Sequence, residues 1–188
     1  MKNYIIKTER LGLRNWLPND VKPFSEMCQD AEVMKYFPKL LSKEESEDFI
    51  NRMQVHFKTY GFCYFAVDIL ETEEFIGFTG MLHQEFKSEY TPCVDIGWRL
   101  KRSAWEKGFA TEAAKACIDF SFNQLNLNDI YSFTPDINKG SEAVMKKIGM
   151  IYLGTFQHPN IINDSQIKDC LVYNITQTTS GYNQNSIR

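Results

Sequence analysis

The residues whose types and spacing could do chemistry gather in segment 105–114, which reads WEKGFATEAA. It holds one glycine, Gly108, and one lysine, Lys107, between a strand-like run over 94–100 and a helical run over 113–124. The first N–H groups of a helix have no partner inside it, and the helix dipole places partial positive charge beside them. The segment therefore predicts a cradle for a phosphate group, with an ordinary capped turn as the alternative.

The sequence lacks the residue patterns of metal, disulfide and nucleotide sites. The five cysteines are scattered without a Cys-x-x-Cys pair, which favours reduced thiols over a zinc site or a disulfide framework. The sequence contains no His-Glu-x-x-His, Gly-x-Gly-x-x-Gly or Walker pattern, which argues against metalloprotease, dinucleotide and nucleoside-triphosphate sites. We therefore expect no metal site in this protein.

The totals describe a globular chain with a small net charge. Its 188 residues suit one domain, and the 43% hydrophobic and 14% aromatic content indicates a packed core. A net charge of -3 gives no electrostatic reason to expect nucleic-acid binding. No long apolar stretch follows Met1, so we expect neither a signal peptide nor a membrane span, and a cytoplasmic location.

Strand and helix patterns alternate along the chain. Ser42 and Glu45 form a capping-box pattern before one helix, and Gly61 is placed to end it. The predicted strands cover residues 8–14, 62–69, 75–82, 94–100, 129–134, 151–154 and 170–175, and the predicted helices begin near residues 18, 42, 113 and 138. This order, βααβββαβαββ, predicts a single α/β (α+β) domain over residues 1–176 and a polar, flexible tail over residues 177–188.

Four segments resemble motifs of the GCN5-related N-acetyltransferase (GNAT) family, in the branch of the ribosomal-protein N-terminal acetyltransferases. Residues 8–14 are similar to the first strand of that branch, and residues 75–80 to its third strand. Residues 105–110 match the acyl-CoA motif Gln/Arg-x-x-Gly-x-Gly/Ala with Trp in first place, and residues 138–150 match the next motif. The resemblance covers residues 8–175. It implies a mixed, mostly antiparallel sheet with a splayed central strand and helices on both faces.

The resemblance also implies that acetyl-CoA is the co-substrate, and it indicates which residues hold it. The main chain of Trp98 and Leu100 would pair with the pantetheine arm, as an added strand does. Arg102 would meet a nucleotide phosphate or face solvent, and Asn138 would contact the cofactor while capping its helix. The pyrophosphate would be bound by main-chain N–H groups of five consecutive residues: Lys107, Gly108, Phe109, Ala110 and Thr111.

The implied reaction is direct attack of a neutral primary amine on the acetyl thioester. Asp95 lies where the family often places an acidic residue. A free aspartate has a pKa of about 3.9, so Asp95 would take the proton through a water or orient the amine. The alternative for Asp95 is an exposed charge on a strand. His83 and Glu85 are further candidates, and a main-chain N–H near Trp98 would stabilise the carbonyl oxygen.

One position departs from the family pattern. Many members carry a tyrosine as general acid where this chain has Met145, which has no proton to give. Ser141, one turn after Asn138, is the nearest replacement, although a helical serine commonly bonds its own backbone. The departure leaves two alternatives to an enzyme: a non-catalytic acyl-CoA-binding sensor or interaction module, and a domain with no cofactor.

The sequence leaves the acceptor open. The resemblance favours a protein N-terminus or a small amine as the partner, without nucleic acid or membrane, in a monomer or homodimer. An α-amine with a pKa of about 8 suits a weak base better than a lysine at about 10.4. We expect His56 to be structural, and His158 to line the acceptor site or face solvent.

Overall fold

The computed structural model describes residues 2–162 and 165–178, and in this part the strands form one sheet in the order β1-β2-β3-β4-β5-β6-β8-β7. All neighbouring strands run antiparallel except β5 and β6, which are parallel. The strands are β1 (Ile6–Lys7), β2 (Leu11–Arg14), β3 (Tyr64–Ile69), β4 (Glu74–Gln84), β5 (Cys93–Leu100), β6 (Asp129–Pro135), β7 (Ile151–Gln157) and β8 (Asp169–Thr176).

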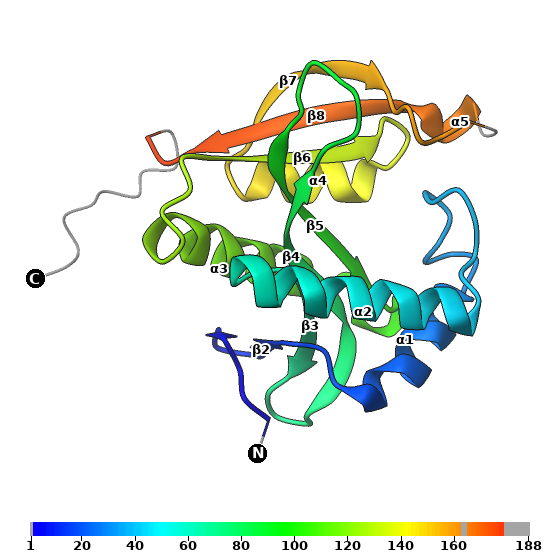
Figure 1. The fold of residues 1–188 in the computed structure, drawn as a ribbon, viewed down its shortest axis with the longest axis vertical. Helices are drawn as coiled ribbons and strands as arrows, with labels where there is room; N and C mark the ends of the chain where they lie inside the picture. The colour runs from blue at the N-terminus through cyan, green and yellow to red at the C-terminus, as the bar shows by residue number, and fades with distance from the viewer. Residues whose placement is uncertain (1, 163–164, 179–188) are drawn as a thin grey trace, which may run out of the picture.

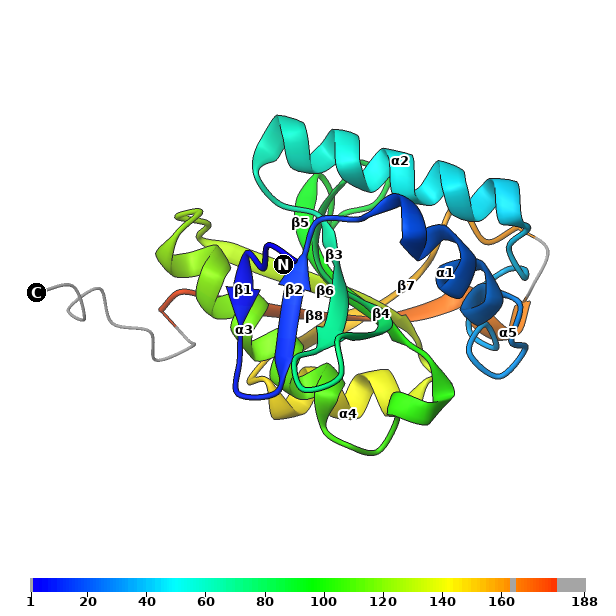
Figure 2. The same ribbon diagram turned by 90° about the horizontal axis from the view of Figure 1, so that it is seen from below.

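Helices cover both faces of this sheet (Figures 1 and 2). Helices α1 (Val21–Cys28) and α2 (Lys43–Tyr60) lie on one face, and α3 (Phe109–Asn123) and α4 (Lys139–Lys147) lie on the other. A short helix α5 (Ser165–Lys168) and two 3-10 turns, η1 (Pro18–Asp20) and η2 (Arg102–Ala104), complete the elements. The predicted single α+β domain with helices on both faces is confirmed.

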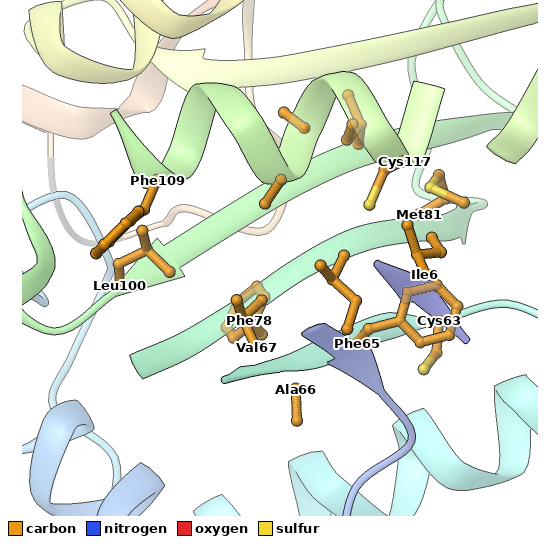
Figure 3. Packing of buried hydrophobic residues seen from close by; sticks show 14 of the residues in the cluster. Ile6, Cys63, Phe65, Ala66, Val67, Phe78, Met81, Leu100, Phe109 and Cys117 are labelled. Carbon is orange, nitrogen blue, oxygen red and sulfur yellow. The ribbon is translucent and has the colours of Figure 1, made fainter. Parts of the chain in front are cut away.

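The central strands are packed on both faces. On one face, Trp16 and Phe24 pack edge-on 5.0 Å apart, and Phe24 also contacts Phe78 of β4. On the other face, Phe109 of α3 lies beside Leu100 of β5 (Figure 3). Strands β4 and β5 are therefore held between two apolar layers, and the side chains that they carry have fixed positions.

Local capping signals predicted the ends of α2. The Ser42 hydroxyl accepts a hydrogen bond from the Glu45 amide at 3.2 Å, and the Glu45 carboxylate accepts one from the Ser42 amide at 2.8 Å. Gly61 follows the last turn with a φ of 80°, a left-handed conformation that glycine adopts without strain. The capping box and the glycine stop are both confirmed.

Two predicted boundaries were wrong. Helix α3 begins at Phe109 rather than near residue 113, and its first turn contributes to the core through Phe109, which is buried. The predicted strand over residues 8–14 is a turn followed by β2. The Thr8 amide donates to the Leu11 carbonyl at 2.9 Å, and the Thr8 hydroxyl oxygen accepts from the Leu11 amide at 2.9 Å, which closes the turn.

Two expectations concern the ends of the molecule and membranes. The predicted flexible tail over residues 177–188 falls, from residue 179 onward, outside the described residues. Within the described ranges, none of the helices combines the length and the apolar character that crossing a membrane requires.

Candidate active site

Strand β5 separates from β6 after a short stretch of contact. The register between them holds one residue pair, Asp95 with Tyr131. Next to it, the Ser132 hydroxyl of β6 donates a hydrogen bond to the Ile96 carbonyl at 2.9 Å. After Ile96, the described residues of β6 pair with β8 only, so one edge of β5 faces a gap. This is the splayed central strand that the resemblance implied.

The main-chain groups that face the gap can be assigned from the alternation of residues along β5. Along a strand, successive residues direct their N–H and C=O groups to opposite sides. The Ile96 carbonyl faces β6, whereas the Lys101 amide donates to Ile76 of β4 at 2.9 Å. Trp98 and Leu100 therefore direct their main-chain groups into the gap. The Leu100 carbonyl already accepts from the Trp105 indole N–H at 2.7 Å, which leaves both groups of Trp98 and the Leu100 amide for a ligand.

A cavity of about 300 Å³ lies at this gap. It is bordered on one side by α4 and the end of β6, which carry the predicted donor-side residues Asn138 and Ser141. It is bordered on the other side by β3, β4 and the α1–α2 connection, which carries Phe37. Asp95 and Trp98 of β5 border it as well. One cavity thus joins residues predicted for the donor with residues predicted for the acceptor.

Asp95 is buried in the wall of this cavity, with 7% of its surface exposed. The Tyr64 hydroxyl lies 2.7 and 2.8 Å from its two carboxylate oxygens and donates a hydrogen bond to the carboxylate. Burial raises the pKa of Asp95 to about 7, and hydrogen bonds from Tyr64, Gln84 and the Leu82 amide oppose part of that rise. The alternative of an exposed strand charge was wrong. A carboxylate with a pKa near neutrality is a competent general base.

Tyr64 is a site residue that the sequence did not reveal. Its ring lies against β5 because residue 97 is a glycine: a Cβ there would stand 3.2 Å from the ring. The same ring stacks on Phe78 with centroids 5.2 Å apart. Burial and the nearby Asp95 raise the pKa of Tyr64 well above its usual value, so it remains a hydrogen-bond donor. Tyr64 holds the carboxylate of Asp95 in place.

Asn138 and Ser141 form a small hydrogen-bonded unit at the start of α4. The Asn138 side-chain oxygen accepts from the Ser141 amide at 3.1 Å, which confirms Asn138 as the helix cap. The Asn138 side-chain amide donates to the Ser141 hydroxyl oxygen at 3.2 Å, so this contact does not use the hydroxyl proton. Met145 borders the same cavity with 1% of its surface exposed, and its thioether has no proton to give.

The turn before α3 is the second place where a ligand fits. Gly108 has a φ of 79° and no side chain to cap the helix, so the amides of Phe109, Ala110 and Thr111 start α3 without a side-chain cap. A second cavity of about 450 Å³ lies here, bordered by Gly108 and Thr111. It is also bordered by Lys115, which the sequence did not single out, by Lys147, which the sequence placed on a solvated helix face, and by the glutamates Glu9 and Glu112. Lys115 lies four residues after Thr111, a helical spacing that could have indicated it.

Arg10 braces this turn from the β1–β2 connection. Its guanidinium donates to the Lys107 carbonyl at 3.1 Å and to the Glu112 carboxylate at 2.7 Å. It also lies over the Phe109 ring, 4.6 Å from the centroid. These contacts hold the amides at the start of α3 in a fixed array, which favours anion binding without reorganisation.

Several predicted candidates lie elsewhere. Arg102 is exposed, and neither cavity is bordered by Arg102, His83 or Glu85. The His83 ring is 3.1 Å from His56, which in turn lies 2.7 Å from the Phe62 carbonyl, so the two histidines form a structural pair. His158 borders the first cavity, and burial lowers its pKa. Within residues 2–162 and 165–178, no group of three or more His, Cys, Asp or Glu side chains could hold a metal ion.

Comparisons with known proteins agree with this geometry. Residues 10–151 match the family model described as "Acetyltransferase (GNAT) domain". The chain is 31% identical to YkkB of Bacillus subtilis over 154 residues, 81% of this chain and 88% of that one. It is also 31% identical to the N-acetyltransferase YnaD of Bacillus subtilis over 153 residues, 81% of this chain and 85% of that one.

A solved structure shows the same fold. An acetyltransferase of the GNAT family from Bacillus anthracis superposes with a TM-score of 0.75 at 28% sequence identity. The match covers 92% of this chain and 98% of the other. The sequence motifs, the separation of β5 from β6 and these relatives agree, and the chain belongs to the GNAT acetyltransferase family.

Proposed function

We propose that this protein transfers an acetyl group from acetyl-CoA to a primary amine by direct attack. The observation that carries the proposal is that buried Asp95, with a pKa of about 7, borders the same cavity as the unpaired edge of β5. One side of the cavity suits a thioester donor and the other suits an amine acceptor. The two would meet beside Asp95 and Trp98.

The residues fit coenzyme A along two stretches. The amides of Phe109, Ala110 and Thr111, with Gly108 leaving room beside them, would bind the pyrophosphate, and Lys115 and Lys147 would add positive charge. The Trp98 carbonyl and the Leu100 amide would hydrogen-bond the pantetheine arm. Acetyl-CoA supplies the acetyl thioester as the group to be transferred.

Asp95 and Trp98 would divide the chemistry between them. Asp95, oriented by Tyr64, accepts the proton of the amine directly or through a water, because its pKa near 7 leaves much of it ionised at neutral pH. The Trp98 amide donates a hydrogen bond to the thioester carbonyl oxygen as negative charge grows there. The Ser141 hydroxyl proton is available to the departing sulfur.

The test is release of the coenzyme A thiol from acetyl-CoA in the presence of an acceptor panel. We expect release that depends on an amine and on acetyl-CoA together. Saturable binding of acetyl-CoA without thiol release on any amine would instead support the acyl-CoA-binding sensor, which the proton-free Met145 favours. The absence of any thermal shift with acetyl-CoA would contradict both functions.

Ser141→Ala tests the leaving-group step. We expect kcat to fall about 100-fold, at the low end of the range for loss of one proton donor, with the Kd for acetyl-CoA unchanged. Stopped-flow measurement of thiol release under single-turnover conditions checks the chemical step itself. Ser132→Ala, which removes a hydroxyl already committed to the Ile96 carbonyl, is the matched control. An unchanged single-turnover rate in Ser141→Ala would mean that the thiolate leaves without a positioned acid.

A further inference from the structure

Arg99 is a half-buried charged residue in the acceptor half of the cavity that the proposed reaction does not use, and its Nε atom is fully buried. It lies on β5 two residues after Gly97 and four after Asp95, and alternation along a strand places these three residues on one face. All three border the cavity, together with Phe37 and Phe78. A guanidinium in this position faces whatever lies between Asp95 and the α1–α2 connection.

Most of the N–H donors of Arg99 are not used by the hydrogen bonds found among the described residues. Its Nη1 donates to the Cys28 sulfur at 3.3 Å, a weak acceptor, and burial raises the pKa of that thiol so that it stays uncharged. In the described part of the chain, Nε of Arg99 is buried without a hydrogen-bond partner. The ion pairs found among the described residues do not include Arg99. A guanidinium has five N–H donors, so most of the donors of Arg99 could bind a ligand.

The aromatic contacts of Arg99 fix its position without neutralising it. The guanidinium carbon lies 3.7 Å from the centroid of the Phe37 ring and 5.4 Å from that of Phe78. Stacking of this kind stabilises a cation, but it leaves a full positive charge in an apolar wall. A partly desolvated charge without a counter-ion is costly, and an anion that enters the cavity with good hydrogen-bond geometry offsets part of that cost. A planar carboxylate matches the guanidinium fork in two parallel hydrogen bonds.

We propose that the acceptor is a small amine that also carries a carboxylate, as an amino acid does, and that Arg99 binds this carboxylate. The inference rests on the proposed acetyl transfer and adds the class of acceptor to it. The amine would lie beside Gly97, between Asp95 and Arg99, with its carboxylate toward Arg99. The rings of Phe37 and Phe78 would contact an apolar body. Arg99 is a specificity-determining residue, because it binds the acceptor and takes no part in proton transfer.

Matched acceptor pairs test the proposal. L-phenylalanine and L-leucine are compared with phenethylamine and isopentylamine, which lack the carboxylate, with the corresponding amides, and with spermidine as a polycation. We expect kcat/KM to be at least 30-fold higher for the amino acids. In Arg99→Met, which keeps the packing of the side-chain stem, this preference should fall to within about 3-fold, mostly through KM. Arg99→Lys should restore part of it. A wild-type preference for spermidine or for the uncharged amines would overturn the proposal.

A binding measurement separates this inference from the proposed function. N-acetyl-L-phenylalanine and N-acetylphenethylamine differ by the carboxylate, and calorimetry measures their affinity for the protein loaded with coenzyme A. We expect binding of the acid to weaken at least 10-fold in Arg99→Met, even if the wild type turns over no acceptor. Unchanged coenzyme A affinity in Arg99→Met shows that the variant is folded. Equal binding of the acid by both proteins, or a loss confined to coenzyme A, would overturn the role of Arg99.

Discussion

Gly108→Asp is expected to raise the Kd for acetyl-CoA at least 100-fold. The substitution places a carboxylate beside the amides that start α3, where the pyrophosphate would bind, and repulsion between the two anions opposes binding. The space itself is not the obstacle, since a Cβ at residue 108 would come no closer than 3.5 Å to Arg10. Isothermal titration calorimetry with coenzyme A measures the effect, and thermal unfolding reports whether the variant is folded.

Gly108→Asn is the matched control. Asparagine has nearly the shape of aspartate, tolerates the left-handed conformation of residue 108 and carries no charge. We expect it to weaken coenzyme A binding only a few-fold, through the conformational strain that both substitutions share. If aspartate and asparagine weaken binding equally, or if Gly108→Asp binds normally, the pyrophosphate does not lie at this turn.

Asp95→Asn is expected to lower kcat at least 100-fold while leaving the Kd for acetyl-CoA unchanged. The amide cannot accept a proton from the attacking amine, and loss of a general base commonly lowers the rate by about 10² to 10⁴. The wild-type kcat should rise with pH through an inflection near 7, the pKa of Asp95, and the variant should lack that inflection. Asp129→Asn, an exposed carboxylate on β6, serves as control. Wild-type activity in Asp95→Asn would exclude Asp95 as the base.

The same variant should be more stable than the wild type at alkaline pH. The pKa of Asp95 is about 7 in the folded protein and about 3.9 in an unfolded chain, so folding favours the protonated form. Its contribution to stability is present below about pH 4 and is lost as the pH rises through about 7. Asp95→Asn avoids this loss, which is on the order of a few kcal/mol. Thermal unfolding at about pH 8 should show a higher Tm for the variant, and a lower Tm would contradict the buried-carboxylate geometry.

Local signals account for what the sequence predicted well. The caps at Ser42, Gly61 and Asn138 and the turn at Gly108 each depend on residues within one helical turn of each other, so their chemistry can be inferred without knowing the fold. The order of strands and helices followed from the change between two periodicities. The roles of the cofactor-side residues came from the resemblance and remain predictions.

The burial of Asp95 could not be predicted, because it depends on pairing between distant strands. From the sequence, an exposed charge on a strand was an open alternative for Asp95, which shares one side of β5 with Gly97 and Arg99. That side is covered by α1, α2 and the connection between them, and Tyr64, 31 residues earlier in the chain, supplies the hydrogen bond. Only the register of β3 against β4, and of β4 against β5, brings Tyr64 to Asp95.

The role of Arg99 could not be predicted from the sequence for a related reason. In the printed sequence it is one more charged residue between Trp98 and Leu100, where a solvent-facing role is the ordinary expectation. Its packing between Phe37 and Phe78 depends on the connection after α1 folding over the sheet. Lys115 and Lys147 likewise meet at the second cavity only because α3 and α4 lie on the same face.

A crystal structure of the protein with coenzyme A and an acceptor tests the central claim most directly. We expect the pyrophosphate on the amides that start α3, the pantetheine arm along the edge of β5 at Trp98, and the thiol inside the cavity beside Asp95. The acceptor amine should then lie within hydrogen-bonding reach of Asp95, directly or through one water. Coenzyme A bound away from the gap between β5 and β6, or a thiol remote from Asp95, would contradict the account.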